Sequence, residues 1–163
     1  MKKGRKILIF SVLGIGIGGA AALGALSYAS QNGEPMGLVD GRLAPCPDSP
    51  NGVSSEPTEP AANRILPLAI TGSSQHLLES LKKVILAEGG TVSREAPDYL
   101  AATFRTGIFK FVDDVEFRVA EDKSVIHVRS ASRVGHSDFG ANRKRVEAIR
   151  RRLEATTGAT ESE

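Results

Sequence analysis

The chain has 163 residues, enough for one domain and too few for two independent hydrophobic cores. Its hydrophobic content of 40% and charged content of 25% are those of a globular protein, which excludes a chain that is disordered throughout. The net charge of +2 includes four basic residues before residue 7, whereas residues 30–163 hold 17 basic and 19 acidic side chains. Because the main part of the chain has no positive excess, we expect no nucleic-acid partner.

An uncharged apolar segment from Ile7 to Ala29 follows the basic cluster. Its 23 residues are enough to cross a bilayer, whereas the apolar region of a cleavable signal peptide has only about 7–15. We therefore predict that residues 1–30 form a single-pass membrane anchor, with the N-terminus cytoplasmic and the C-terminal domain periplasmic or extracellular. Cleavage stays open as an alternative, because Ser27 and Ala29 have the spacing of the small residues that a signal peptidase recognises before its cleavage site.

Residues 31–63 are rich in residues that interrupt secondary structure, with six prolines and four glycines. This density excludes long helices and central strands, so we predict a linker after the anchor. Its length would hold a domain clear of the bilayer, although the portion from Cys46 to Ser55 could instead be fixed across the domain surface.

We expect an α+β domain over residues 64–155, in which a small antiparallel sheet packs with two helices in the order β-α-β-β-β-β-α. The segment from Arg64 to Ile70 is predicted as an edge strand, because Pro67 lacks a donor for a sheet ladder. A helix follows, with Ser73 or Ser74 as its N-terminal cap and a pair of glycines at its end. The apolar residues of this helix form one stripe: Leu77, Leu78, Leu81, Val84 and Ile85.

Four strands are predicted after this helix from their alternation and their β-branched and aromatic residues. They are Thr91 to Glu95, Tyr99 to Thr106, Asp114 to Ala120 and Ser124 to Ser132. The connections between them are short, which favours antiparallel pairing. In the third strand Glu116 and Arg118 alternate with apolar residues, so we expect one face of the sheet to lie in water.

The second predicted helix begins after Ser137 or Asp138 and packs one stripe inward. The members of that stripe are Asn142, Val146, Ile149 and Leu153. The basic residues of this helix are expected to point outward: Arg143, Lys144, Arg145, Arg150, Arg151 and Arg152. A polar tail over residues 156–163 completes the chain and is expected to fray.

The densest polar run, Arg129 to Arg143, joins a predicted strand end to the start of the second helix. Backbone N–H groups at a helix start and the forked guanidinium groups of arginines suit a phosphate or a carboxylate. We therefore predict a binding site for an anionic small molecule or an envelope component. Its candidate residues are Asp113, Asp114, Glu116, Arg129, Ser132, Arg133, His136, Asp138, Asn142 and Arg143. The alternative is that the arginines pair with the acidic residues of the neighbouring strand and only hold sheet and helix together.

Catalysis and metal binding have weaker support in the sequence than a binding or scaffolding role. The alternative function is an envelope hydrolase that uses Asp114 or His136 as its acid or base. One histidine beside scattered carboxylates is not a zinc signature, so we predict no metal and no cofactor. Cys46, Ser130 and Ser132 are candidate nucleophiles, but no nucleophile motif surrounds them.

Three blocks of the sequence resemble one known family. The blocks are Cys46 to Asn51 with Val53 to Ser55, Phe111 to Phe117, and Arg129 to Gly135 with Asp138 to Arg143. Through them, roughly residues 43–153 resemble the family catalogued as domain of unknown function 1499. The resemblance implies a small secreted or membrane-associated protein of bacteria or plastids with no established activity. The first block of that family usually carries a second cysteine where this chain has Gly52, so the resemblance does not extend to a paired-cysteine site.

Overall fold

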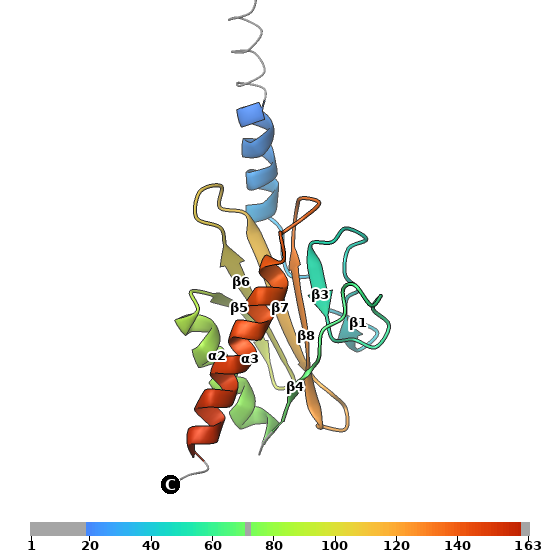
Figure 1. Ribbon diagram of the computed structural model, residues 1–163, viewed down its shortest axis with the longest axis vertical. Coiled ribbons are helices and arrows are strands. Elements are labelled where there is room, and N and C mark those ends of the chain that lie inside the picture. The colour runs from blue at the N-terminus through green and yellow to red at the C-terminus, as the bar shows by residue number, and fades with distance from the viewer. Residues whose placement is uncertain (1–18, 71–72, 161–163) are drawn as a thin grey trace, which may run out of the picture.

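The computed structural model of the chain describes residues 19–70 and 73–160. The fold is α+β, as the sequence predicts, and its centre is a six-stranded antiparallel sheet (Figure 1). The described residues form three helical segments, which are residues 19–31, α2 (Ser74–Ala87) and α3 (Ala141–Thr160). The strands of the sheet are β3 (Gly52–Ser54), β4 (Leu68–Ala69), β5 (Thr91–Ala96), β6 (Tyr99–Arg105), β7 (Val112–Val119) and β8 (Val125–Ser132).

The sheet runs in the order β3-β8-β7-β6-β5, and β4 pairs with β8 beside this path. The four long strands are therefore neighbours in chain order, as expected from their short connections. The register sets Glu116 of β7 opposite Arg129 of β8, and Asp113 opposite Ser132. These cross-strand pairs bring together the polar residues that the sequence singled out.

One face of the sheet carries the main hydrophobic core, which α2 and α3 cover. The helix stripes are confirmed: Leu81 and Ile85 of α2 and Val146 and Ile149 of α3 are all fully buried. Phe117 of β7 lies beneath them in the same cluster. The predicted serine cap is also confirmed, because the side chain of Ser73 accepts the backbone N–H of His76 at 3.2 Å.

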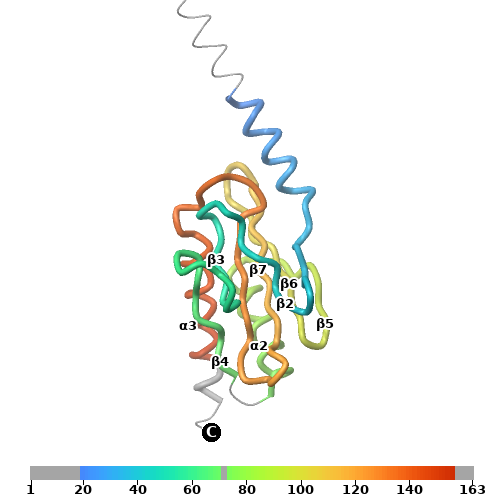
Figure 2. The backbone as a smooth tube through the Cα atoms, turned by 90° about the vertical axis from the view of Figure 1, so that its right-hand side faces the viewer, coloured from blue at the N-terminus to red at the C-terminus, as the bar shows by residue number. Residues whose placement is uncertain are grey.

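The opposite face of the sheet is covered by residues 30–59, which we call the strap. The strap forms a small hairpin of β1 (Leu38–Val39) and β2 (Arg42–Leu43) and then adds β3 to the edge of the sheet, antiparallel to β8. Its first part and α3 lie on opposite sides of the sheet (Figure 2).

The expectation of a linker over residues 31–63 is therefore wrong for this segment, and the alternative of a portion fixed across the domain is what the structure shows. The prolines and glycines only exclude long regular elements, and three short strands and tight turns are compatible with them. The expected wet face of the sheet is corrected for the same reason. All eight residues of β7 are buried, because the strap covers the face on which Glu116 and Arg118 lie.

Two predicted boundaries also differ. The strand expected from Arg64 to Ile70 is only β4, preceded by an isolated parallel bridge between Ser54 and Arg64. Pro67 has no N–H group to donate to a sheet ladder, and its carbonyl oxygen accepts a hydrogen bond from Arg150 Nη1 at 2.7 Å. At the other end, the expected frayed tail is helical in part, because α3 continues to Thr160.

No helix within residues 19–70 and 73–160 is long and apolar enough to cross a membrane. Residues 1–18 of the predicted anchor lie outside the described residues. Helix 19–31 is the part of the predicted anchor that the structure describes, and it leaves the body at one end (Figure 1).

Gly90, in the turn between α2 and β5, offers a test of how tightly α2 packs on the sheet. A Cβ atom at this position would lie 2.7 Å from Ile85 Cγ2 and 2.7 Å from Phe104 Cζ, closer than atoms can pack. We expect Gly90→Ala to lower the free energy of unfolding by about 1–3 kcal/mol, because overpacking must displace the core. Denaturant unfolding of the purified chain measures this. Gly107→Ala, where nothing lies within 4 Å, is the matched control. An equal stability of the two variants would contradict the described packing.

Candidate functional site

Glu116 is the centre of the polar residues beneath the strap and is 0% exposed. Its Oε1 accepts the hydroxyl proton of Tyr99 at 2.6 Å and the backbone N–H of Gly37 at 2.7 Å. Its Oε2 accepts from Arg129 Nη1 at 3.1 Å. Burial, followed by the hydrogen bond to Glu116, raises the pKa of Tyr99, so the phenol stays protonated and donates. Both carboxylate oxygens of Glu116 are thus occupied by protein donors.

A second carboxylate under the strap, Glu56, comes from the strap itself. Its Oε1 accepts from Arg118 Nη2 at 2.8 Å and Nε at 3.1 Å, and from the backbone N–H of Leu43 at 3.1 Å. Its Oε2 is buried, and no hydrogen-bond partner for it occurs among the described residues. Arg118 and Glu56 therefore tie the strap to β7 by a buried ion pair.

Asp114 and Arg133 form a bidentate pair at the end of the sheet nearest helix 19–31. Arg133 Nη2 donates to Oδ1 at 2.7 Å and Nε donates to Oδ2 at 2.8 Å. Arg133 Nη1 also donates to the carbonyl oxygens of Ser30, at 3.0 Å, and of Gly33. One guanidinium group thus joins β7, β8 and the chain that leaves the helix, with both oxygens of Asp114 engaged.

Asp113 lies on the helix-covered face of the sheet and pairs with α3. Its Oδ1 accepts the hydroxyl proton of Ser132 at 2.6 Å, and its Oδ2 accepts from Arg145 Nη2 at 2.7 Å. The Arg145 guanidinium also lies 4.7 Å above the Phe104 ring. The expectation that Arg145 points outward is wrong, because the buried carboxylate of Asp113 draws its side chain onto the sheet.

Asn142, in the first turn of α3, is fully buried and connects three parts of the fold. Its Oδ1 accepts from Ser130 Oγ at 2.6 Å and from Arg145 Nη1 at 2.6 Å. Its Nδ2 donates to the backbone carbonyl of Asn51 in the strap at 2.9 Å. Ser130 and Ser132, the candidate serine nucleophiles, thus donate their hydroxyl protons to Asn142 and Asp113.

Three of the ten candidate residues lie outside this buried cluster. His136 is exposed in the loop between β8 and α3. The carboxylate of Asp138 accepts the backbone N–H groups of Gly140 at 2.9 Å and of Asn142 at 2.7 Å. The donors at the start of α3 that could hold an anion are therefore taken by a protein side chain. Arg143 donates to backbone carbonyls of residues 62 and 64, away from the cluster.

The contacts of the cluster favour the structural alternative over an anion site. Arg129 and Arg133 pair with Glu116 and Asp114, as that alternative requires. Ligand binding by the candidate residues stays a prediction. Sequence reasoning missed Glu56 as a partner for Arg118, because nothing in a proline-rich segment indicates which of its acids will be buried.

Cys46 lies in the strap beside a further buried acid, Glu59, whose Oε1 accepts the Cys46 backbone N–H at 2.9 Å. Burial, and then the nearby charge of Glu59, raise the pKa of the Cys46 thiol to about 12, although Arg129 acts in the opposite direction. A Cβ atom at Gly52 would lie 3.4 Å from Cys46 Sγ. Within the described residues no group of three or more His, Cys, Asp or Glu could hold a metal ion.

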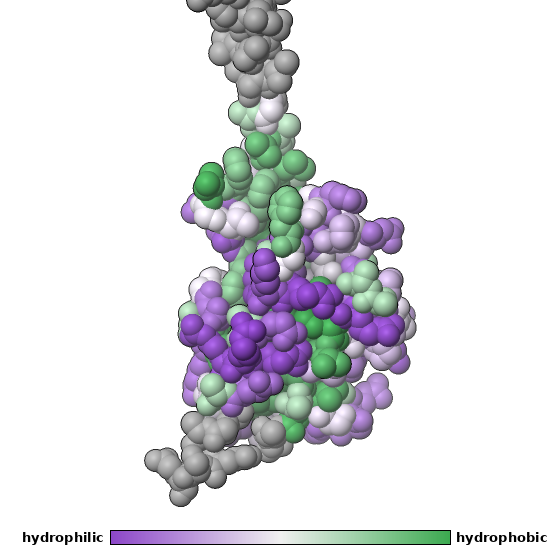
Figure 3. All heavy atoms as spheres, in the orientation of Figure 1, coloured by the Kyte–Doolittle hydropathy of each residue, from purple (hydrophilic) through white to green (hydrophobic). Residues whose placement is uncertain are grey.

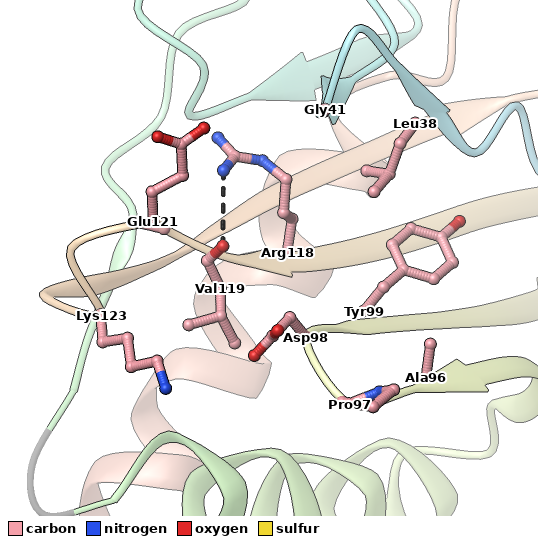
Figure 4. Close-up of a pocket in the computed structure, with 11 residues that line it drawn as sticks. Leu38, Gly41, Ala96, Pro97, Asp98, Tyr99, Arg118, Val119, Glu121 and Lys123 are labelled. Atoms are coloured by element: carbon pink, nitrogen blue, oxygen red, sulfur yellow. Dashed lines mark hydrogen bonds between the residues drawn. The ribbon is translucent and has the colours of Figure 1, made fainter.

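An open pocket of about 400 Å³ lies between the β1–β2 hairpin and the turns that join β5 to β6 and β7 to β8 (Figure 4). Leu38, Tyr99 and Val119 supply apolar surface, and Lys123 lies at one side. The side chain of Arg118, from β7, extends along the pocket, and its Nη1 donates to the Val119 carbonyl at 3.4 Å (Figure 4). Its size falls in the range of about 300–1,000 Å³ typical of small-molecule sites.

A family model described as "Protein of unknown function (DUF1499)" matches residues 42–153 of the chain. The matched region begins at β2 and ends within α3, so it contains most of the strap, the whole six-stranded sheet, α2 and the first part of α3. No curated protein matches the chain.

Arg133→Ala tests whether the buried pairs hold the fold. The change leaves the Asp114 carboxylate buried without its bidentate partner, so we expect a loss of about 3–5 kcal/mol in the free energy of unfolding. Denaturant unfolding of the full chain in mild detergent measures it. Arg151→Ala, at an exposed position on α3, is the control and should change stability by less than about 0.5 kcal/mol. An Arg133→Ala chain as stable as the parent would show that the cluster is not structural.

We expect Cys46 to be alkylated slowly, because its raised pKa keeps it as the thiol and the reactive species is the thiolate. With a pKa of about 12, the thiolate is a small minority at pH 8 and increases steadily toward pH 11. Cys46 is the only cysteine, so mass spectrometry after iodoacetamide treatment reports this site alone. The urea-unfolded chain is the control, and its rate should level off about one pH unit above the ordinary cysteine pKa of about 8.5. A folded chain that levels off there too would contradict the burial described.

Proposed function

Because the chain belongs to the DUF1499 family, whose description assigns no activity, we propose a function from the geometry. The proposal is a non-catalytic binding or scaffolding module, held at the outer side of a membrane by its N-terminal segment. The observation that carries the binding or scaffolding role is the set of buried ion pairs, which join the strap, the sheet and α3 into one rigid body.

Helix 19–31 supports the membrane attachment. It contacts the body near its C-terminal end, where Ser30 Oγ accepts the backbone N–H of Val112 at 2.8 Å. Its side chains Leu23, Leu26 and Tyr28 are exposed, and apolar surface follows the helix (Figure 3). A helix with exposed apolar side chains that continues an uncharged segment fits lipid better than water. The basic residues before Ile7 would then keep the N-terminus in the cytoplasm.

The contacts of Asp114, one of the two candidate catalytic residues, do not favour the alternative of an envelope hydrolase. A general acid or base must come within hydrogen-bond reach of its substrate. Asp114 is buried, and both of its oxygens are bonded to Arg133. His136 is exposed, on a loop outside the buried cluster.

A binding role would use surfaces that the strap leaves open, and the pocket of Figure 4 is one of them. Its walls are largely apolar, and its exposed charged residues are Lys123, Asp98 and Glu121. This lining suits a small, largely apolar molecule with a polar group. The rigid body would hold the pocket at a constant distance from the membrane.

The proposed membrane attachment predicts which C-terminal reporter fusions are active. In a Gram-negative host we expect a C-terminal alkaline phosphatase fusion to be active and a green fluorescent protein fusion, exported as an unfolded chain, to be dark. As a control, the four basic residues before Ile7 are changed to glutamine, which should reduce the alkaline phosphatase activity because orientation depends on them. A bright fluorescent fusion of the parent chain in the cytosolic fraction would overturn the proposal.

A further inference from the structure

Two loops flank helix 19–31 at the end of the body where the helix leaves it. They are the β6–β7 turn, residues 106–111, and the β8–α3 loop, residues 133–140, and both rise beside the helix (Figures 1 and 2). Ile108 in the first loop is 87% exposed and Phe139 in the second is 90% exposed, the highest values for large hydrophobic residues in the described chain. Phe109, beside Ile108, is also exposed. Both loops therefore present apolar tips.

The backbone of Phe139 strengthens the case that its exposure has a function. Its φ of +53° is in the left-handed region, which is unfavourable for a bulky residue without a glycine's freedom. Strained positions of this kind cost about 1–3 kcal/mol and are kept mainly at sites that bind something. The ring lies almost wholly in solvent, so hydrogen bonds to the side chains of Ser137 and Asp138 hold this turn, and packing of the ring does not.

A hydrogen bond sets the height of the first loop relative to the helix. Ser27 Oγ donates to the backbone carbonyl of Phe109, so the β6–β7 turn lies level with Ser27. The uncharged segment from Ile7 to Ala29 would be about 34 Å long as a helix, close to the hydrocarbon thickness of about 30 Å. Ser27 then falls at the boundary between lipid and water on the outer side, and Phe109 falls at the same depth.

The polar neighbours of the tips suit a lipid surface. Exposed Arg105 and Lys110 enclose the β6–β7 turn, and no acidic residue lies between them. Lys144, in the first turn of α3, is exposed beyond the second loop, and the acidic residue of that loop, Asp138, accepts the backbone N–H groups of Gly140 and Asn142. Where a membrane surface carries anionic headgroups, each basic side chain near it gains about 1 kcal/mol. Exposed Tyr28 on the helix is of the residue type that gathers at membrane interfaces.

We propose that the β6–β7 turn and the β8–α3 loop insert Ile108, Phe109 and Phe139 into the outer interface of the bilayer that holds the N-terminal helix. The body then lies directly on the lipid. This inference rests on the proposed membrane attachment. It also follows from the packing of the strap, because Ser30 is already bonded to Val112 and no free spacer separates the helix from the body.

Single tryptophans can test this directly, because the chain contains none. Phe139→Trp and Ile108→Trp are made in the full chain and reconstituted in vesicles of phosphatidylcholine and phosphatidylglycerol with acyl chains brominated near the headgroup. We expect both emissions to shift to shorter wavelength and to be quenched by the bromolipid, to an extent similar to that of Tyr28→Trp in the helix. Leu66→Trp, at a 75% exposed position beside β4, is the control and should remain unquenched.

The outcomes separate this inference from the proposed function. If Tyr28→Trp is quenched while the two loop tryptophans emit as in water, the body stands off the membrane and the inference is wrong, although the anchor remains. If none of the three is quenched, the membrane attachment itself fails. If the loop tryptophans shift to shorter wavelength without quenching, a second copy or another protein covers the tips, which also overturns the inference.

Discussion

The fold depends on buried carboxylates that must each have a cationic partner. Glu116, Asp114 and Glu56 lie between the sheet and the strap, where an unpaired charge would cost several kcal/mol. Of the arginines that pair with them, Arg118 lies in β7, Arg129 lies in β8, and Arg133 directly follows β8. Such pairs contribute little net stability compared with an apolar core, but they accept only one arrangement of the segments that supply them.

This constraint fixes the position of the strap and, through it, of the N-terminal helix. Arg133 binds Asp114 and the carbonyls of Ser30 and Gly33, so the chain enters the body at the end of the sheet beside the helix. A flexible linker would have left the distance between helix and body open. The packed strap removes that freedom, and the apolar tips at Ile108 and Phe139 then lie beside the helix at a defined height.

Much of the polar cluster was predictable as a set of residues, but not as a set of contacts. The cross-strand pairing of Asp113 with Ser132 and of Glu116 with Arg129 follows from alternation in two adjacent strands, and Arg133 reaches Asp114 from the position just after β8. Arg145 was misplaced because helix periodicity does not show that a basic residue beside the apolar stripe of α3 will pair with a buried acid, and only the position of Asp113 beneath it turns the Arg145 side chain toward the sheet. Glu56 has no local pattern that marks it, since its partner lies 62 residues away.

The sequence by itself determined the α+β class, the apolar stripes of α2 and α3, the serine cap and the four long strands. These features depend on residues within a few positions of one another, where the periods of a helix and a strand are visible. Only the tertiary structure decided that the proline-rich segment becomes a strap, with Gly52 paired to Ala131 across the chain. That outcome depends on buried charges in distant strands. The sequence of a strand alternates between polar and apolar residues whether its polar face lies in water or under a covering segment, so the alternation cannot tell the two cases apart.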